Sequence, residues 1–256
     1  SHAGDGRPQT GKRDFRQRVL STRAWDNSSF VAYVNLVGGQ DELVFDGGSM
    51  VLDQRGELVA GAKAFEEDLL VVDLDLEEVL LDRLHDPRRR KEKLASLADG
   101  ILRRVRLQPL KGPKRRKALP PRTPVNPSRP EEVYRALVLG TGDYVRKNGF
   151  KRVVLGVSGG IDSSLTAAVA VDALGKESVA GVAMPSMFSS SESLEDARAL
   201  AQNLGIEFHV LPIGEVYHAY LKALEAPFRG RKPDVTEENL QARVRGNLLM
   251  GLSNKF

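Results

Sequence analysis

The sequence contains no cysteine, and this absence excludes three kinds of chemistry. Disulfide bonds, thiolate metal ligands and a cysteine nucleophile all need a sulfhydryl group. Whatever this chain does must therefore use oxygen, nitrogen and backbone groups.

Long apolar runs are absent as well. No stretch approaches the roughly 18 apolar residues that a membrane-spanning helix needs. The first six residues, Ser1 to Gly6, have neither the basic nor the apolar region of a secretory signal. We therefore expect no membrane association and a cytoplasmic location. With 256 residues, of which 41% are hydrophobic, the chain is long enough to form one or two domains with a core.

Aromatic residues are missing from the most basic part of the chain. Residues 83–122 hold 15 Lys and Arg against 3 Asp and Glu, an excess of 12 positive charges, so the remainder of this +4 chain carries −8. The runs Arg88–Lys91 and Lys114–Lys117 could bind nucleic acid. Because no aromatic side chain is there to stack on bases, we interpret the segment as a solvated linker and do not expect a nucleic-acid partner.

The N-terminal third predicts a helix followed by strands. Its periodicity predicts a helix over residues 12–28, and the apolar runs after it are typical of strands. These runs are Phe30–Val37, Ser49–Asp53, Glu57–Ala60 and Asp68–Asp73. Asp53 to Gly56 has the pattern of a tight turn between antiparallel strands. Five prolines between Pro120 and Pro130 cannot continue a helix or a central strand, so they indicate a domain boundary.

After the prolines, helical and strand patterns alternate. We expect helices over residues 131–148, from about 162, and over 192–204, with strands over 153–157, 179–184 and 206–211. Such alternation favours an α/β fold with a doubly wound parallel sheet.

The most informative stretch follows the first of these strands. Gly156, Ser158, Gly159 and Gly160 precede a helix that starts near Asp162. Glycines free backbone N–H groups, and the helix adds the positive end of its dipole, so the turn can hold an anion such as phosphate. It lacks the lysine of a Walker motif, which suits a pyrophosphate that departs. The Asp162 carboxylate fits beside phosphates only through a bridging Mg²⁺.

Ser-Gly-Gly-x-Asp-Ser after a strand resembles the pyrophosphate-loop ATPases, which adenylate a substrate and release pyrophosphate. The resemblance implies a Rossmann-like fold of the adenine nucleotide alpha hydrolase type, with ATP and Mg²⁺ bound. The plainer alternative is a strand-to-helix turn with an incidental capping aspartate.

Two further segments resemble one branch of these enzymes, the glutamine-dependent NAD(+) synthetases. Residues 183–193 are similar to their serine-rich loop, and Met184 stands where this fold places adenine. Residues 237–250 resemble their Glu-Asn-x-Gln-Ala-Arg-x-Arg motif on a helix whose inward stripe is Leu240, Val244 and Leu248. The plainer alternatives are a loop with a serine cap and a solvated helix face. Residues 30–49 are similar to the second half of the nitrilase-like glutaminase domain that is fused to these synthetases.

The resemblance implies a division of the chain and a set of site residues. Residues 1–82 would be the C-terminal part of an α-β-β-α nitrilase-like domain, 83–127 a basic, Pro-rich linker and 128–256 the N-terminal part of the synthetase domain. The residues expected to contact ATP are Gly156, Val157, Ser158, Gly159, Gly160, Ile161, Asp162, Ser163, Ser164 and Met184. Asp162 would also bind Mg²⁺. Deamido-NAD(+) would contact Asn239, Arg243 and Arg245. The Glu, Lys and Cys of the glutaminase lie upstream in the family, so we assign no catalytic residue here.

The function implied is a carbon–nitrogen ligase that makes NAD(+), AMP and pyrophosphate from deamido-NAD(+), ATP and glutamine-derived ammonia. We expect the chain to be a piece of a longer protein, weakly active or inactive alone, and to form a homo-oligomer. Two alternatives stay open: another adenylating enzyme of the pyrophosphate-loop type, similar to GMP synthetase or a tRNA-modifying enzyme, and a non-catalytic nucleotide-binding fragment.

Overall fold

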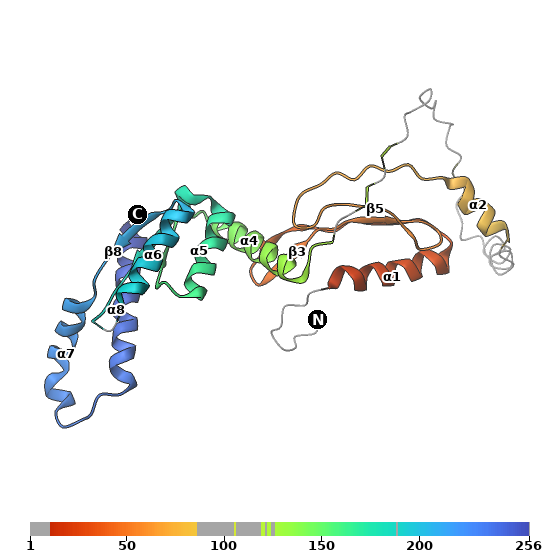
Figure 1. The fold of residues 1–256 in the computed structure, drawn as a ribbon. Helices are drawn as coiled ribbons and strands as arrows, with labels where there is room; N and C mark the ends of the chain where they lie inside the picture. The colour runs from red at the N-terminus through yellow and green to blue at the C-terminus, as the bar shows by residue number, and fades with distance from the viewer. Residues whose placement is uncertain are drawn as a thin grey trace. The chain divides into compact units, whose positions relative to one another are not determined.

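The computed structural model describes residues 11–85, 105, 119, 120, 122, 123, 126–187 and 189–255. The chain divides into two compact units, Ser1–Gly38 with Phe45–Val133, and Gly39–Val44 with Tyr134–Phe256 (Figure 1). The basic runs Arg88–Lys91 and Lys114–Lys117 lie outside the described residues, as do residues 1–10. The division into domains at residues 82 and 128 stays a prediction.

The first unit is built on an antiparallel sheet covered by one helix. Its elements are α1 (Lys12–Asn27), β1 (Val31–Tyr33), β4 (Met50–Leu52), β5 (Leu58–Gly61) and α2 (Leu76–His85), with the strands in the order β1-β4-β5. Ala24 of α1 and Met50 and Leu52 of β4 form the fully buried core. The predicted helix and the turn from Asp53 to Gly56 are confirmed, since the Gly56 amide donates to the Asp53 carbonyl at 3.0 Å.

Two strand predictions in this unit were wrong, the first in part and the second entirely. The run Phe30–Val37 is not one strand, because after β1 the Asn35 side chain holds the backbone out of the ladder by donating to the Gly47 carbonyl at 2.9 Å and to Asp46 at 3.0 Å. The residues that follow form a two-stranded sheet of β2 (Val37–Gln40) and β3 (Leu43–Asp46), and the sequence pattern did not predict β3.

The run Asp68–Asp73 is not a strand at all. Leu69 and Val71 are 80% and 56% exposed, so these apolar side chains have no sheet to cover in the described part of the chain. Arg122 holds this segment by donating to the Leu69 carbonyl at 3.0 Å and to Asp68 at 2.7 Å. Helix α2, which follows, was not predicted either, although Asp75 caps it by accepting from the Glu77 amide at 2.9 Å.

The second unit is the predicted α/β fold. Its elements are α4 (Arg129–Lys147), β6 (Val153–Gly156), α5 (Ile161–Leu174), the 3-10 turn η1 (Lys176–Ser178), β7 (Val179–Ala183), α6 (Ser191–Leu204), β8 (Glu207–Val210), α7 (Gly214–Phe228) and α8 (Val235–Lys255). The strands are parallel in the order β6-β7-β8. All three strands and helices α4, α5 and α6 agree with the sequence prediction within a few residues, whereas α7 was not predicted.

Helices cover both faces of this sheet. Buried alanines of α5 and α6, Ala170 and Ala201, pack against Val179 and Ile206 on one face. On the other face α8 lies along β6, with Leu249 beside Gly156. The apolar run over residues 153–157 predicts a buried parallel strand, but β6 is only partly buried because it ends the sheet among the described residues.

The tip of the β2–β3 sheet, Gly39–Val44, packs on α4 within the second unit. A β-carbon at Gly39 would lie 2.9 Å from the Cα of Gly140, so only glycine allows this approach. Polar contacts hold the tip: the Gly39 amide donates to Asp143 at 2.7 Å, and Lys147 Nζ donates to the Gly39 carbonyl at 2.5 Å. Helix α4 leads directly to β6 and so to the loop described next.

Candidate functional site

The loop between β6 and α5 lies at the carboxyl end of a parallel strand, where open α/β sheets bind ligands. The Val157 amide donates to the Val182 carbonyl at 2.9 Å, which ties the start of the loop to β7. Gly159 has φ of +81°, and a β-carbon there would lie 2.4 Å from the Ser193 carbonyl oxygen. The loop therefore needs glycine at this position, both for its backbone conformation and for its approach to α6.

The serine hydroxyls of the loop bond to the loop itself. Ser163 Oγ accepts from the Ser158 amide at 3.2 Å and donates to the Gly160 carbonyl at 2.9 Å. Ser164 Oγ donates to the same carbonyl at 2.9 Å, and Ser158 Oγ accepts from the Gly160 amide at 3.3 Å. These bonds preshape a turn of small polar groups, and an anion would have to replace some of them.

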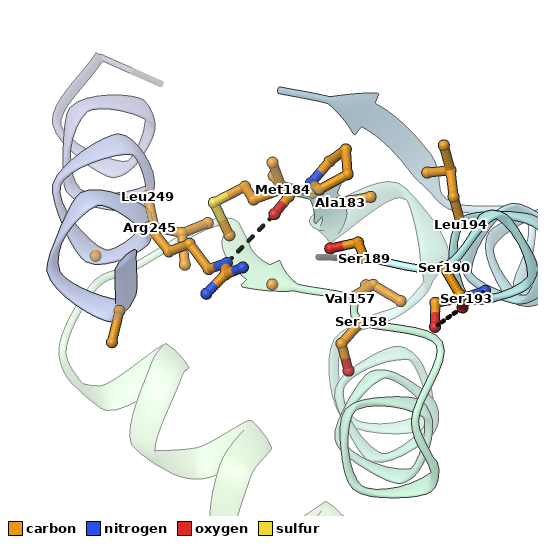
Figure 2. A pocket seen from close by; sticks show the side chains of 15 residues that line it. Val157, Ser158, Ala183, Met184, Ser189, Ser190, Ser193, Leu194, Arg245 and Leu249 are labelled. Atoms are coloured by element: carbon orange, nitrogen blue, oxygen red, sulfur yellow. Dashed lines mark hydrogen bonds between the residues drawn. The ribbon is translucent and has the colours of Figure 1, made fainter. Parts of the chain in front are cut away.

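A cavity of about 780 Å³ opens beside this loop, a size suited to a nucleotide (Figure 2). Its walls come from the ends of β6 and β7, the start of α6 and the middle of α8. The residues that line it are Gly156, Val157, Ser158, Val182, Ala183, Met184, Pro185, Ser189, Ser190, Ser193, Leu194, Ala242, Arg245, Gly246 and Leu249.

Two helix N-termini flank the cavity. Helix α5 begins after Gly160 without a side-chain cap, and α6 is capped by Ser190, whose Oγ accepts from the Ser193 amide at 3.2 Å. The partial positive charge at helix N-termini favours a negatively charged ligand. Figure 2 shows Ser158 and Ser193 on neighbouring walls of the cavity.

Helix α8 supplies the opposite wall. Arg245 is half-buried, and its Nε donates to the Met184 carbonyl at 3.2 Å. Arg245 is the one charged residue among those that line the cavity in the described structure. The inward stripe predicted on this helix is confirmed, since Val244 is fully buried and Leu240 and Leu248 are half-buried.

The structure brings some of the predicted site residues to the cavity and leaves others outside its lining. Gly156, Val157, Ser158, Met184 and Arg245 line it. The predicted residues that follow Ser158, in the rest of the loop and the first turn of α5, are not among the lining residues: Gly159, Gly160, Ile161, Asp162, Ser163 and Ser164. Asn239 and Arg243 are exposed on α8 and are not among the residues that line the cavity.

Sequence reasoning missed several residues of the cavity wall. Ser190 and Ser193 belong to the serine-rich segment that was singled out, and the capping pattern pointed to them. Ala242 and Gly246 flank Arg245 on α8, and only the packing of this helix against β6 shows that these small residues face the cavity.

The carboxylate of Asp162 is exposed in the first turn of α5. In the part of the chain that the structure describes, no group of three or more His, Cys, Asp or Glu could hold a metal ion by itself. A lone carboxylate beside a phosphate site suits Mg²⁺, which usually takes one or two carboxylates together with substrate phosphates and water. Among the described helices none is long and apolar enough to span a membrane.

Comparisons with known proteins match both units. The family model for NAD synthase matches residues 133–256, and the model for carbon-nitrogen hydrolase matches residues 11–83. The chain is 54% identical over 246 residues to a glutamine-dependent NAD(+) synthetase of Thermotoga maritima and 55% identical over 245 residues to that of Aquifex aeolicus. Each alignment covers 96% of this chain and 42% of the relative.

A solved structure agrees with these relatives. The glutamine-dependent NAD(+) synthetase of Acinetobacter baumannii, in complex with adenosine diphosphate, is 38% identical with a TM-score of 0.76, over 97% of this chain and 40% of that chain. The chain thus spans about two fifths of the length of the relatives it matches. Residues 133–256 match the NAD synthase family and residues 11–83 match the carbon-nitrogen hydrolase family, and the relatives that the chain matches over both parts are glutamine-dependent NAD(+) synthetases.

Proposed function

We propose that residues 128–256 bind ATP in this cavity and carry the adenylate-forming half of glutamine-dependent NAD(+) synthesis. The observation that carries the proposal is the loop from Gly156 to Ser164, which stands at the carboxyl end of β6, opens into the cavity and rests its Gly159 on the start of α6. The adenosine diphosphate in the Acinetobacter baumannii relative supports a nucleotide as the ligand.

The bound nucleotide would use the residues predicted from the sequence. Its phosphates would meet the backbone amides and hydroxyls of the loop, which are Gly156, Val157, Ser158, Gly159, Gly160, Ile161, Ser163 and Ser164. Its base would lie against Met184 at the end of β7. Ser163 and Ser164 would turn their hydroxyls from the Gly160 carbonyl toward the phosphates.

In the proposed reaction, a nicotinate carboxylate oxygen of deamido-NAD(+) attacks the α-phosphorus of ATP. The bond from that phosphorus to the bridging oxygen breaks, and pyrophosphate leaves with the bond's electron pair. Ammonia then attacks the activated carbonyl carbon, the bond to AMP breaks, and a proton goes to solvent as NAD(+) forms. The loop amides stabilise the charge that builds on pyrophosphate, so no protein nucleophile is needed.

Asp162 would hold Mg²⁺ together with phosphate oxygens, because its carboxylate is exposed at the start of α5 next to the loop. When bound, the ion would neutralise the charge of the departing pyrophosphate. The polar face of α8 that carries Asn239 and Arg243 would contact deamido-NAD(+), with Arg245 at the cavity.

Calorimetric titration of this chain with ATP tests the proposal. We expect ATP to bind, GTP to bind more weakly, and added Mg²⁺ to tighten ATP binding. In Asp162→Asn the metal-free affinity should persist while the gain from Mg²⁺ is lost. The proposed site would be contradicted if the chain bound no ATP. It would also be contradicted if the parent and Asp162→Asn had the same ATP affinity both with and without Mg²⁺.

Deamido-NAD(+) is the second ligand to titrate. We expect it to bind in the presence of ATP and to bind more weakly to Arg243→Gln. Ammonium and both substrates should give little or no pyrophosphate with residues 1–256 alone. Binding of ATP without any binding of deamido-NAD(+) would favour a different adenylating enzyme.

We also propose that the chain forms a homo-oligomer. Helix α1 leaves Phe15 and Trp25 about two-thirds exposed, at 63% and 65%. Light scattering would give a multiple of the 28.1 kDa chain mass if this is correct and the single mass if it is not.

A further inference from the structure

We infer that Arg245 is a positioning residue of the nucleotide site, which holds the end of β7 in place from across the cavity. This inference rests on the proposed function. Its starting point is the bond from Arg245 Nε to the Met184 carbonyl, which joins α8 to a segment 61 residues earlier in the chain (Figure 2).

The chain after β7 is anchored by three consecutive carbonyls, and only one of them depends on a side chain. The Ala183 carbonyl accepts from the Leu211 amide at 2.8 Å, and the Pro185 carbonyl accepts from the Ile213 amide at 3.0 Å. Both bonds tie the segment to the chain that follows β8. The Met184 carbonyl between them is held by Arg245. Because proline has no N–H, residue 185 cannot add a backbone donor, and the cavity side of the segment relies on this guanidinium.

The side chain of Met184 lies beside Gly156, so the position of Met184 affects the start of the loop. Its Cε lies 3.2 Å from where a β-carbon of Gly156 would stand, and Leu249 Cδ1 of α8 lies 3.7 Å from the same point. Met184 therefore fills the space between the end of β6 and α8. A shift of Met184 would change the surface against which the adenine base of ATP would lie. It would also change the packing beside Gly156, where the phosphate-binding loop begins.

The chemistry of arginine suits such a role. The bond through Nε fixes the plane of the guanidinium, so the two terminal amino groups keep one direction, and they have no other partner among the described residues. Arg245 is also the one charged residue among the described lining residues. The effect of its charge and the effect of its hydrogen bond to Met184 must therefore be tested separately.

Two substitutions separate these effects. Arg245→Met removes both the donor and the charge, whereas Arg245→Gln removes only the charge, because its amide nitrogen stands as many bonds from the backbone as Nε does. Arg198→Met is the matched control, since Arg198 is exposed on α6 and does not line the cavity.

The measurements are hydrogen exchange of the Leu211 and Ile213 amides in nucleotide-free protein, and the dissociation constant for ATP. We expect Arg245→Met to speed both exchanges and to weaken ATP binding about tenfold, the effect of losing one hydrogen bond to a charged group. Arg245→Gln should keep the slow exchange and recover most of the affinity. Arg198→Met should match the parent in both measurements.

Other outcomes would overturn the inference. Unchanged exchange in Arg245→Met would mean that the guanidinium does not hold the segment. Slow exchange with tenfold weaker ATP binding in Arg245→Gln would assign the effect to charge alone. If the parent chain bound no ATP, the proposed function would fail, while the exchange of Leu211 and Ile213 would still decide whether Arg245 anchors β7.

Discussion

Gly159 is the residue on which the shape of the loop depends most directly. Its φ of +81° is unfavourable for any residue with a β-carbon, and that atom would stand 2.4 Å from the Ser193 carbonyl oxygen. Backbone of α6 cannot yield as a flexible side chain would. The strain of the left-handed conformation and the collision with α6 therefore act together at this position.

For Gly159→Ala we expect the loop to move away from α6 and ATP affinity to fall at least about tenfold, since the loop amides would no longer point at the phosphates. Gly149→Ala is the matched control: its φ is +78°, but nothing lies within 4 Å of the added carbon. That variant should lose about 1 kcal/mol of stability and bind ATP as the parent does. Calorimetry and urea unfolding measure the two effects, and equal ATP affinities would refute the requirement for glycine.

In the first unit, the carboxylate of Asp46 interacts with two arginine side chains. Its carboxylate accepts from Arg16 Nη1 at 2.9 Å and Asn35 Nδ2 at 3.0 Å, and the hydrogen bond to Asp46 raises the pKa of Arg16. Arg13 beside them is buried without a hydrogen-bond partner among the described residues, and burial lowers its pKa. Asp46 thus offsets two guanidinium groups.

Asp46→Ala should lower the unfolding free energy of this unit by about 2 kcal/mol, because it removes the carboxylate that interacts most strongly with these two partly buried cations. The exposed pair of Lys63 and Glu66 supplies the control, and Lys63→Met should cost less than about 1 kcal/mol. Trp25, the only tryptophan, reports the unfolding of this unit in urea. A loss no larger than that of the control would show that Asp46 does not stabilise the arginines.

At the level of whole elements, the helices and strands of the second unit follow from local pattern. Apolar residues at helical spacing predict the inward face of α6. All five are buried or half-buried in the structure: Leu194, Ala197, Leu200, Ala201 and Leu204. In the first unit local pattern failed where side chains compete with backbone pairing. Asn35 ends β1, and Arg122 holds residues 68–69 outside any strand. Neither partner is near in sequence, so no local pattern could reveal them.

The edge strands of the parallel sheet yield a pH prediction. Glu207 of β8 pairs with Arg152 and with His209, and its pKa is lowered from 4.5, first by the hydrogen bond to Arg152 and then by that to His209. A depressed carboxyl pKa stabilises the fold above the unfolded value, and this contribution is lost as the pH falls through the folded value.

The parent should therefore be more stable than Glu207→Gln above about pH 4.5, and the difference should shrink as the pH falls below it. Urea unfolding from pH 3 to pH 7 measures this difference, and NMR titration of the Glu207 carboxyl gives its pKa directly. The effect should be small because the pair is exposed to solvent. A difference that grows on acidification would contradict the assignment.

At the scale of the whole molecule, the uneven distribution of charge along the chain follows from the sequence alone. Residues 83–122 carry the basic excess, and most of them lie outside the described residues. We expect single-stranded RNA to bind no tighter than about 10⁻⁵ M at physiological salt, and ATP to leave that affinity unchanged. Tight, salt-dependent binding that disappears when Arg88–Lys91 and Lys114–Lys117 are neutralised would instead favour a tRNA-modifying activity. Filter binding at two salt concentrations distinguishes these results.

The sequence by itself was enough for the order of elements from α4 to β8, the glycine-rich loop and its place between strand and helix. Periodicity and the preference of glycine for positive φ act over a few neighbouring residues, so a linear pattern contains them. Tertiary structure alone decided that Gly159 meets Ser193, that Arg245 reaches Met184, and that Asn239 and Arg243 stay outside the cavity lining. Those contacts join residues far apart in the chain, and their distances depend on how whole helices pack against the sheet.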